Sequence, residues 1–459
     1  MIIENYLADI NMIKGITYNS KEVKEGFAFV AIPGTKADGY SFIPQAIKNG
    51  AKLVVAEKDF KIPDGIEKRI VPDARKALAE LSSEFYGDPS KKLTLIGITG
   101  TNGKTTTAYL IESILKTAGF KVGKIGTIDT PTGLTTPEAP ELHKYFADCL
   151  KQGITHVVME VSSHSLAQDR VWGCDFDIAI FTNLTHDHLD FHKTMDEYLV
   201  AKQKLFAELK NDAFAIVNSD DPYAQKIIDV CNAEVITYGL REVKHEMRDE
   251  KGRALSEFNT SLIGEYNLYN ILAAYHCGLA LNLNPKIIKK GIEALKGVPG
   301  RFERIGENVI VDFAHSPDAL RKLLELVKSF TIGRIILVFG CPGDRDREKR
   351  PIMGKIAAEL ADYVIVTTDD PHTERPEQII DEIALGMTND KCQMSNREKR
   401  ADRKEAIQKA LGIAQKDDIV VIAGRGHETY QDFNGKKVEI DDRQVVKEFW
   451  KKKVRRSHD

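Results

Sequence analysis

The most constraining feature of this chain is the segment Leu93–Thr106, which reads LTLIGITGTNGKTT. An apolar run rich in branched residues leads into a glycine-rich turn, and residues 107–115 continue with the apolar spacing of a helix. Gly100 and Gly103 let the backbone curl so that several N–H groups point to one spot, where the helix N-terminus adds partial positive charge. The pattern predicts a strand, a phosphate-binding loop and a helix.

Within this segment we predict that Lys104 reaches the terminal phosphates of a nucleotide and that Thr105 offers its hydroxyl to Mg²⁺. The spacing departs from the standard G-x-x-x-x-G-K-[ST] motif, because Gly97 lies one residue too early. A simple glycine turn with a solvated lysine is the alternative, but the turn, the lysine and the flanking elements agree with each other. The predicted loop contacts to a nucleotide are Gly100, Thr101, Asn102, Gly103, Lys104, Thr105 and Thr106.

Length and composition describe a soluble, globular chain of several domains. A length of 459 residues exceeds what one hydrophobic core supports. Hydrophobic residues make up 42% and charged residues 29%, as in ordinary globular proteins. The net charge of −3 gives no overall attraction to nucleic acid or to anionic membranes. We therefore expect neither nucleic acid nor a membrane as a partner.

The cysteines and the apolar runs indicate a cytoplasmic protein. Six cysteines are scattered without a C-x-x-C pair, so neither a zinc knuckle nor a redox dithiol is predicted. Residues 1–9 carry acidic groups and lack the basic start of a signal peptide. No apolar run approaches the ~20 residues of a membrane span. We expect a cytoplasmic protein in a reducing compartment.

Strand and helix signals alternate along the whole chain, with breaks near residues 87–90 and 298–301. We therefore predict an α/β protein of three domains: a small N-terminal α/β domain over residues 1–88, a central P-loop-type ATPase domain with a mainly parallel sheet over 89–300, and a C-terminal Rossmann-like domain over 301–459. The predicted strands outside the loop segment are 28–32, 52–56, 156–161, 178–182, 213–217, 308–312, 334–340, 363–367 and 418–424.

Glu160 follows an apolar strand, where a carboxylate is well placed to bind Mg²⁺ at the edge of a parallel sheet. Taken alone, a salt bridge at a strand end is the simpler interpretation. Ser162, Ser163 and His164 come next and could suggest a serine nucleophile. No G-x-S-x-G elbow surrounds them, so hydrolase chemistry is weakly supported.

Three histidines and two aspartates lie close together in the segment 186–192, which reads HDHLDFH. Their spacing is compatible with a zinc site. A nearby phosphate loop also needs histidine and carboxylate ligands for a metal–triphosphate complex, and some of these histidines could simply form hydrogen bonds. We expect one or two of the three histidines to contact metal or phosphate.

Taken together, these segments and several further ones resemble the Mur ligases, ATP-dependent enzymes that build the peptide of cell-wall precursors. The resemblance covers essentially the whole chain, and the order and spacing are most similar to the MurE branch, which adds the third residue. The matching segments are 100–106, 160–164, 186–190, 198–206, 218–222, 264–270, 300–303, 312–320, 340–351 and 424–428.

The resemblance implies that the first domain binds the uridine nucleotide, the second ATP and the third an incoming amino acid. Implied additional ATP contacts are Asn267, Arg301 and Asp312, and Arg301 lies where a closing third domain would bring it to phosphate. Positions matching the UDP-muramoyl-peptide site are Ser20, Thr135, Thr136, Ser162, Gln168 and Arg170. Positions matching the amino-acid site are Arg345, Asp370, Pro371, His372, Glu374, Gly424 and Glu428.

The resemblance also implies a metal site and a mechanism. The implied Mg²⁺ ligands are Thr105, Glu160, His188 and Lys202, the last as a carbamate, because a protonated lysine cannot bind a cation. From its helical pattern alone Lys202 would lie on a solvated face. The implied catalytic residues are Lys104, Glu160, His188, Lys202 and Arg301. They act in the transfer of the γ-phosphate of ATP to a peptide carboxylate, and an amine then attacks the acyl-phosphate.

The sequence departs from the family pattern in the segment 368–374, which reads TDDPHTE. Diaminopimelate-adding members typically have Asn and Arg where this chain has Asp370 and His372. Histidine cannot reproduce the bidentate grip of arginine on a carboxylate. Asp369, Asp370 and Glu374 make the segment acidic, which favours a substrate with a second ammonium group. We therefore expect a diamino acid, with lysine-like substrates preferred to meso-diaminopimelate.

Other functions remain open at this point. The nearest alternatives are a paralogue that uses another amino acid, a pseudomurein peptide ligase and, less well matched, a folylpolyglutamate synthetase. An ATP-binding scaffold without chemistry and a metal-dependent hydrolase built on the histidines are alternatives of other classes. The expected cofactors are ATP and Mg²⁺, the expected partners are the UDP-muramoyl-peptide and amino-acid substrates, and we expect a monomer.

Overall fold

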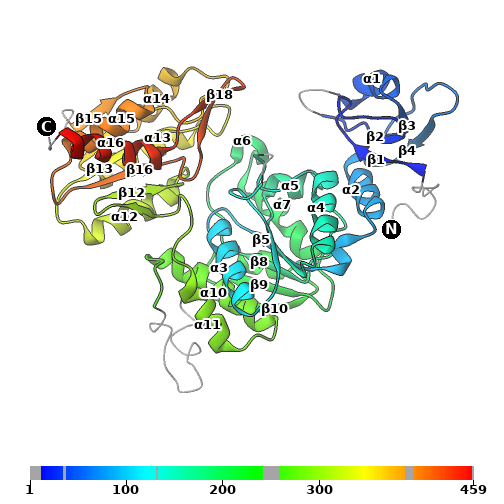
Figure 1. The fold of residues 1–459 in the computed structure, drawn as a ribbon, viewed down its shortest axis with the longest axis horizontal. Helices are drawn as coiled ribbons and strands as arrows, with labels where there is room; N and C mark the ends of the chain where they lie inside the picture. The colour runs from blue at the N-terminus through cyan, green and yellow to red at the C-terminus, as the bar shows by residue number, and fades with distance from the viewer. Residues whose placement is uncertain (1–11, 35–37, 131–132, 241–258, 388–395, 457–459) are drawn as a thin grey trace.

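The computed structural model describes residues 12–34, 38–130, 133–240, 259–387 and 396–456. The chain forms three α/β bodies in sequence order, with the first and third on opposite sides of the second (Figure 1). The α/β class with mainly parallel sheets is confirmed. Each of the three larger sheets lies inside one predicted domain range, while the boundaries themselves remain a prediction. The N-terminal residues 1–9 and Cys392 lie outside the described residues.

The N-terminal body is a parallel four-stranded sheet in the order β1-β2-β3-β4. Asp73 begins α2 by accepting hydrogen bonds from the backbone N–H groups of Arg75 and Lys76, which explains why the helix starts there. The elements are β1 (Gly15–Thr17), β2 (Phe27–Val30), a 3-10 turn (Gly39–Phe42), α1 (Ile43–Lys48), β3 (Ala51–Ala56), β4 (Glu67–Ile70), α2 (Ala74–Phe85) and a second 3-10 turn (Pro89–Lys92).

The central body is a six-stranded, wholly parallel sheet in the order β10-β9-β8-β5-β7-β6. Its elements are β5 (Thr94–Thr99), α3 (Lys104–Thr117), β6 (Val122–Ile125), α4 (Ala139–Lys151), β7 (His156–Glu160), α5 (Ser163–Ala167), β8 (Ile178–Phe181), α6 (Leu189–His192), α7 (Met195–Ala207), β9 (Phe214–Asn218), α8 (Ala224–Ile228), β10 (Glu234–Tyr238), α10 (Glu265–Ala280) and α11 (Pro285–Ala294).

Two cores cover the two faces of this central sheet. Helices α4, α5, α7 and α8 pack on one face, and α3, α10 and α11 pack on the other. Strand residues contribute alternately to the two cores, as Leu95 and Ile96 of β5 do, because successive side chains point to opposite faces. The strands are mainly apolar since both faces are buried, and polar residues such as His156 and Glu160 of β7 lie at strand ends.

The C-terminal body is a six-stranded sheet in the order β11-β12-β16-β13-β14-β15, parallel except for β11, with helices on both faces. Its elements are β11 (Glu303–Ile305), β12 (Val309–Asp312), α12 (Pro317–Phe330), β13 (Ile335–Phe339), α13 (Lys349–Leu360), β14 (Tyr363–Val366), α14 (Pro376–Leu385), β15 (Arg397–Lys399), α15 (Arg403–Ile413), β16 (Ile419–Ala423), β17 (Tyr430–Phe433), β18 (Lys436–Glu439) and α16 (Asp442–Arg456).

Every strand that we predicted overlaps an observed strand, but several strands were missed. The missed strands are short, exposed or at a sheet edge, as for β4, β15 and the hairpin of β17 and β18. Such strands lack the buried apolar run on which the prediction relied. The hairpin proves important, because it contacts Asp370 and His372, which line the cleft described below.

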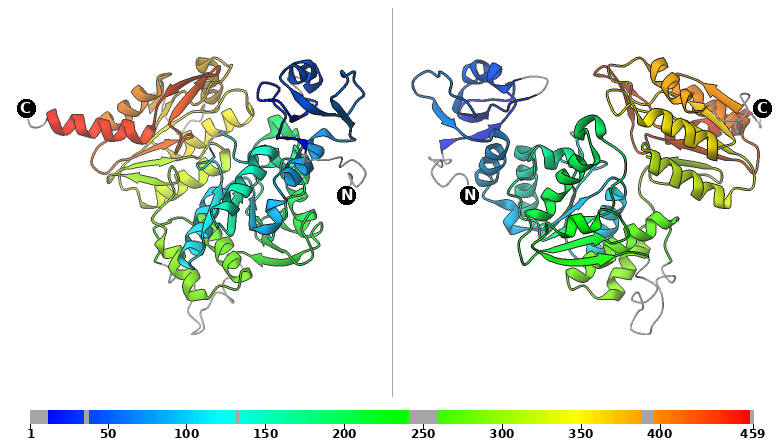
Figure 2. Two further views of the ribbon diagram at one scale, coloured as in Figure 1. Left: turned by 45° about the vertical axis from the view of Figure 1, so that its right-hand side comes forward. Right: turned by 180° about the vertical axis from the view of Figure 1, so that it is seen from behind.

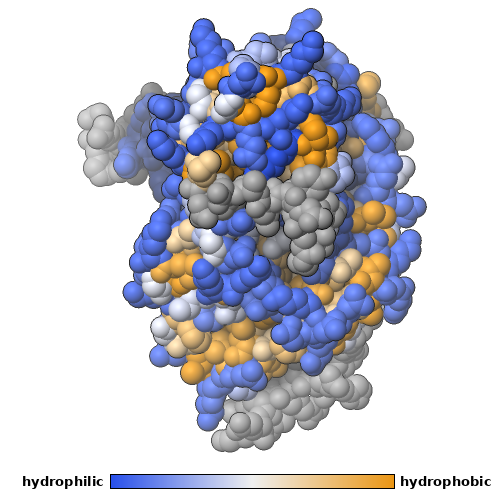
Figure 3. All heavy atoms as spheres, turned by 90° about the vertical axis from the view of Figure 1, so that its right-hand side faces the viewer, coloured by the Kyte–Doolittle hydropathy of each residue, from blue (hydrophilic) through white to orange (hydrophobic). Residues whose placement is uncertain are grey.

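Seen from the side of the N-terminal body, the surface is mainly hydrophilic, with hydrophobic residues in separate groups (Figure 3). Among the helices of the described residues, none has the length and apolar character needed to cross a membrane.

The N-terminal body and the C-terminal body each contact the central body at a separate junction. Figure 2 shows the three bodies in two further views. At the first, the indole Nε1 of Trp172 donates to Glu80 at 2.9 Å, and the ammonium of Lys76 lies 3.8 Å from the centre of the Trp172 ring. At the second, Asn102 donates to Asp318 at 3.1 Å. The second junction closes over the phosphate-binding loop.

Helix α7 provides a test of the central core. Phe206 is fully buried on the sheet, whereas Val200 on the same helix is 57% exposed. Phe206→Ala should lower the free energy of unfolding of the central domain by about 3–5 kcal/mol, because the ring leaves a cavity. Val200→Ala should change it by less than about 0.5 kcal/mol. Urea unfolding of both variants measures the difference, and similar values for the two would contradict this account of the core.

Candidate functional site

The loop between β5 and α3 has the backbone shape that a phosphate-binding loop requires. Gly103 has φ +90° and a Cβ there would lie 2.4 Å from Oδ1 of Asn270. A Cβ at Gly100 would lie 1.8 Å from Oγ1 of Thr182. Both positions therefore exclude side chains, so the loop can wrap tightly before the N-terminus of α3.

Lys104 begins α3 and its side chain bends back over this loop. Its ammonium group donates to the carbonyl oxygens of Gly100 at 2.8 Å and Thr101 at 2.9 Å. Burial of the ammonium lowers its pKa, and the nearby Glu160 carboxylate opposes that shift. The Lys104 side chain thus lies against the loop, while its contact with the phosphates of a nucleotide remains a prediction.

Glu160 lies at the end of β7 and is 1% exposed. Its two carboxylate oxygens accept hydrogen bonds from Oγ1 of Thr105 at 2.9 and 3.0 Å, and one of them accepts from the backbone N–H of Thr127 at 3.0 Å. These are contacts of a carboxylate held rigidly at the mouth of the loop. The oxygens of Thr105 and Glu160 form a donor set that suits a hard cation such as Mg²⁺.

Arg301 comes from the connection to the C-terminal body and reaches the same place. Its Nη2 lies 3.3 Å from Oγ1 of Thr105, and its guanidinium lies 4.1 Å from the centre of the Phe313 ring. Its Nη1 is buried without a hydrogen-bond partner among the described residues. A buried, unpaired guanidinium N–H is costly, and an anionic ligand would satisfy it.

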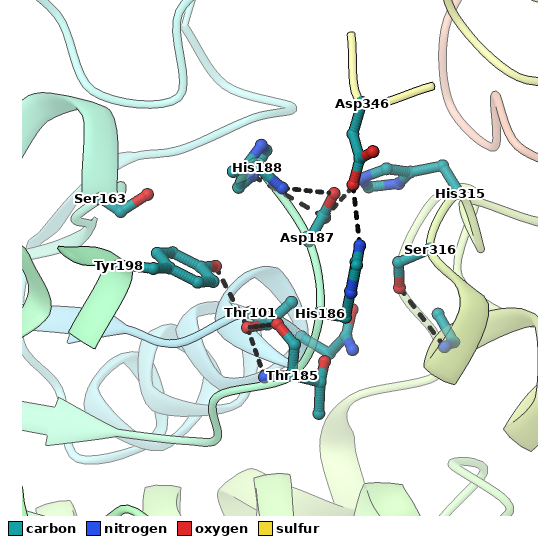
Figure 4. Close-up of polar contacts among 12 residues, drawn as sticks. Thr101, Ser163, Thr185, His186, Asp187, His188, Tyr198, His315, Ser316 and Asp346 are labelled. Carbon is teal, nitrogen blue, oxygen red and sulfur yellow. Dashed lines mark hydrogen bonds and ion pairs between the residues drawn. The ribbon is translucent and has the colours of Figure 1, made fainter. Parts of the chain in front are cut away.

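The histidines of the predicted cluster have different partners, and Figure 4 shows two of them, His186 and His188. His186 pairs with Asp346 of the C-terminal body at 2.9 Å, and His192 bonds to the hydroxyl of Ser163 at 2.9 Å. His188 adopts φ +57° and lines the cleft, with its ring edge toward His164. Burial lowers the pKa of His188 well below its usual value, so the ring is neutral and able to bind a metal.

Asp187, between His186 and His188, is almost completely buried. Its Oδ1 forms an ion pair with Nζ of Lys349, on the C-terminal body, at 3.3 Å, and its Oδ2 lies 3.7 Å from Nε2 of His315. The charge of Lys349 holds the pKa of Asp187 well below its usual value against the effect of burial. Part of the cluster therefore joins two domains.

Lys202 is buried, with 1% of its surface exposed, so the solvated face that its helical pattern alone favoured is wrong. Its ammonium lies 4.5 Å from the centre of the Tyr198 ring, and no carboxylate in the described part of the chain forms an ion pair with it. Burial and the charge of Lys104 lower its pKa well below the ordinary value. A neutral lysine amine is the form that can react with carbon dioxide.

The residues matched to a UDP-muramoyl-peptide lie on two levels. Thr135, Ser162 and Arg170 line the cleft. Thr136 is fully buried and donates to the backbone carbonyl of Glu160 at 2.9 Å, while Gln168 accepts from Arg170 at 2.6 Å. Ser20 lies apart in the N-terminal body, where its carbonyl oxygen accepts from Asn49 at 2.8 Å.

The residues matched to an amino acid form the opposite wall. Arg345, Asp370, His372, Gly424 and Glu428 line the cleft, whereas Pro371 and Glu374 do not. The two carboxylate oxygens of Glu374 are held by Arg350 at 2.8 and 3.0 Å, and Arg347 also pairs with one of them at 2.7 Å.

This geometry corrects the charge argument for lysine. Glu374 is bound to two arginines, so it is not free to attract a substrate ammonium. Asp370 pairs with Arg425 at 2.6 Å. The acidic character of the segment 368–374 is thus largely neutralised by arginines from distant parts of the sequence. The preference for lysine loses its physical basis, and Arg425 is a residue that the sequence alone did not single out.

The three predicted ATP contacts outside the phosphate-binding loop line the same cleft. Asn267 and Asp312 line it together with Arg301. Asn267 donates to the carbonyl of Ile263 at 2.7 Å, and Asp312 accepts from the backbone of Ala314 at 2.7 Å. Their side chains are therefore fixed by their own backbones.

Residues 101–106 of the loop, Glu160, His188, Arg301 and the other lining residues named above surround one continuous cleft between the central and C-terminal bodies, with a volume of about 920 Å³. The phosphate-binding loop and its cations form one wall, and the peptide-matching residues Thr135, Ser162 and Arg170 also line the cleft. The carboxylates Asp369, Asp370 and Glu428 of the C-terminal body form what we call the acid-rich wall. A cleft of this size admits a nucleotide together with parts of other substrates. The arrangement suits phosphoryl transfer next to an amine-binding wall.

Comparison with known proteins agrees with this arrangement. Three family models match consecutive parts of the chain: "Mur ligase family, catalytic domain" over residues 12–86, "Mur ligase middle domain" over 98–278 and "Mur ligase, glutamate ligase domain" over 300–426. Residues 1–11, 87–97, 279–299 and 427–459 lie outside these matches.

Similar curated proteins include the UDP-N-acetylmuramoyl-L-alanyl-D-glutamate–2,6-diaminopimelate ligases of Clostridium tetani and Aquifex aeolicus. The first is 44% identical over an alignment of 467 residues including gaps, and the alignment covers 95% of this chain and 94% of that protein. The second is 43% identical over 461 residues, which cover 96% of this chain and 94% of that protein.

Solved structures show the same relationship. A structure of a 2,6-diaminopimelate ligase of the same name has a TM-score of 0.65 at 31% identity and covers 96% of this chain and 95% of its own. The MurF ligase of Thermotoga maritima in complex with ADP has a TM-score of 0.64 at 22% identity, covers 98% of this chain and 100% of its own, and shows the shared fold. On these matches, together with the loop, the buried Glu160 and the cleft, the chain belongs to the Mur ligase family.

Proposed function

We propose that this chain is an ATP-dependent ligase that joins the carboxylate of a UDP-N-acetylmuramoyl-dipeptide to a diamino acid in the synthesis of peptidoglycan precursors. The observation that carries the proposal is the single cleft in which the phosphate-binding loop, Glu160 and the acid-rich wall face each other. The similar proteins named above are diaminopimelate ligases of this type. We also propose a cytoplasmic monomer.

In the first step, the dipeptide carboxylate attacks the γ-phosphate of ATP, giving an acyl-phosphate and ADP. Lys104 and Arg301 stabilise the charge that spreads over the phosphoryl oxygens, because both are positively charged groups beside the loop. Bound Mg²⁺ would be held by Thr105, Glu160, His188 and carbamylated Lys202, and would neutralise phosphate charge.

In the second step, the amine of the amino acid attacks the acyl carbon, the C–O bond to phosphate breaks, and an amide, phosphate and a proton are released. Asp369 and Glu428 on the acid-rich wall attract the ammonium form of the substrate. Contacts between the bodies, such as Asn102 with Asp318, close the cleft over the acyl-phosphate and exclude water.

For the acceptor we propose meso-diaminopimelate in preference to lysine, which reverses the expectation from sequence. The arginine pairs of Asp370 and Glu374 remove the negative charge that argued against a distal carboxylate. Arg345 is exposed, lines the cleft and is available to bind that carboxylate. His372 is held in the wall by its backbone, which donates to the carbonyl of Asp432 at 3.0 Å.

The proposed function predicts phosphate release that depends on three substrates. Phosphate should appear only when ATP, UDP-N-acetylmuramoyl-dipeptide and an amino acid are all present, as a coupled assay can measure. Lys104→Ala should lower kcat by at least about 100-fold, since it removes the cation above the loop. Phosphate release without the amino acid would indicate a hydrolase, and nucleotide binding without any release would indicate a scaffold.

Lys202 should carry a carbamate in the active enzyme. Lys202→Ala should be nearly inactive and should partly recover with added short carboxylates, because they supply the missing anionic oxygen ligand. Nuclear magnetic resonance with isotope-labelled bicarbonate should reveal the carbamate in the wild type and not in the variant. Full activity after complete removal of carbon dioxide and bicarbonate would contradict this role.

The acceptor is tested by comparing kcat/KM for meso-diaminopimelate, L-lysine and L-ornithine on one UDP-muramoyl-dipeptide preparation. Meso-diaminopimelate should be preferred. Arg345→Ala should reduce that preference by about 1–3 kcal/mol, because the distal carboxylate loses its cation, whereas turnover with lysine should change less. Arg347→Ala, a neighbouring exposed arginine that pairs with Glu374, is the matched control. A preference for lysine in the wild type would refute the proposal.

A further inference from the structure

Arg425 lies directly behind the acid-rich wall of the cleft. It follows β16, is 1% exposed and does not line the cleft itself. Its Nη1 lies 2.6 Å from Asp370 and 3.3 Å from Asp369, and its Nη2 lies 3.2 Å from Glu428. One buried guanidinium thus contacts three carboxylates, and each of these three residues does line the cleft.

Arg425 supplies the positive charge beside three crowded carboxylates. Oxygen atoms from Asp369, Asp370 and Glu428 all lie within 4.8 Å of one another. Burial and mutual repulsion raise the pKa of Asp370 and of Glu428, and the charge of Arg425 opposes both shifts. Without Arg425 the pKa values of Asp370 and Glu428 would rise further, and a protonated carboxyl attracts an ammonium group much less.

Arg425 also fixes the shape of the wall. It donates to the backbone carbonyl of Tyr430, at the start of the β17–β18 hairpin. The hairpin in turn donates from the backbone N–H of Asp432 to Asp370 at 2.9 Å, and Asn434 donates to the carbonyl of His372 at 2.8 Å. The guanidinium therefore ties β16, the segment 369–372 and the hairpin into one unit.

We propose that Arg425 is a positioning and specificity-determining residue for the acceptor amino acid: it holds Asp369, Asp370 and Glu428 as a fixed anionic wall that receives the substrate ammonium. This inference rests on the proposed ligase function. A lysine in its place would keep the charge but offers no planar fork, so it cannot reproduce the separate contacts of Nη1 and Nη2.

The test compares Arg425→Met and Arg425→Lys with the wild type in the three-substrate ligation assay. Arg425→Met should raise KM for the amino acid by about 10-fold or more, while KM for ATP and for the UDP-dipeptide stay within about twofold, because only the acceptor wall is disturbed. The acid limb of its kcat/KM profile for the amino acid should move to higher pH, since the carboxylates lose the cation that keeps them ionised. Arg425→Lys should have a smaller effect in the same direction.

A double variant separates positioning from simple loss of structure. Asp370→Asn removes one of the charges that Arg425 balances. The double variant Arg425→Met/Asp370→Asn should therefore have a lower KM for the amino acid than Arg425→Met alone. Arg334→Met is the matched control, because Arg334 pairs with Asp418 at 2.7 Å at the opposite end of β13 and β16. It should lower stability without a selective change in acceptor KM.

The outcomes are distinct. A wild type that ligates no amino acid refutes the proposed function and not only the role of Arg425. With an active wild type, an equal rise of all three KM values, a selective acceptor effect in Arg334→Met, or no recovery in the double variant would overturn the inference. If Arg425→Met does not fold, Arg425→Lys decides: an unchanged acceptor KM and an unchanged ratio of diaminopimelate to lysine would refute it.

Discussion

The carboxylate of Glu160 is the interaction on which the rest of the site depends. It is buried at the end of β7 and receives hydrogen bonds from Thr105 of α3 and Thr127 of the loop after β6. Three neighbouring segments of the central body are thereby fixed around one negative charge. Together with Asp312 and Asp187, that charge also opposes the effect of burial on Arg301 and Lys104.

A second constraint is the excess of positive charge at this end of the cleft. Lys104, Lys202 and Arg301 all have lowered pKa values, mainly because burial disfavours their charged forms. Such an environment is unfavourable in the protein alone and favourable for a polyanion such as a triphosphate. The lowered pKa of Lys202 further favours the neutral amine, which explains why a buried lysine without a carboxylate partner fits the site.

The opposite end of the cleft has the reverse problem, with three carboxylates close together and Arg425 behind them. The two ends thus differ in sign, and the distance between them separates the binding of phosphate from the binding of an ammonium group. Two contacts join the central and C-terminal bodies beside the cleft: Arg301 contacts Thr105, and Lys349 forms an ion pair with Asp187. The site is therefore formed by residues of both bodies.

The sequence by itself determined the α/β class, the order of the buried strands and the phosphate-binding loop, because these depend on local apolar runs and glycines. Family resemblance added the site residues, and the structure brings most of them to one cleft. Only the tertiary structure decided how charges are paired: Glu374 with Arg350, Asp370 with Arg425, and His186 with Asp346. These partners lie far apart in the sequence, so the acidic run 368–374 looked free when it was not. Electrostatic specificity depends on net local charge after folding, and no linear pattern contains that sum.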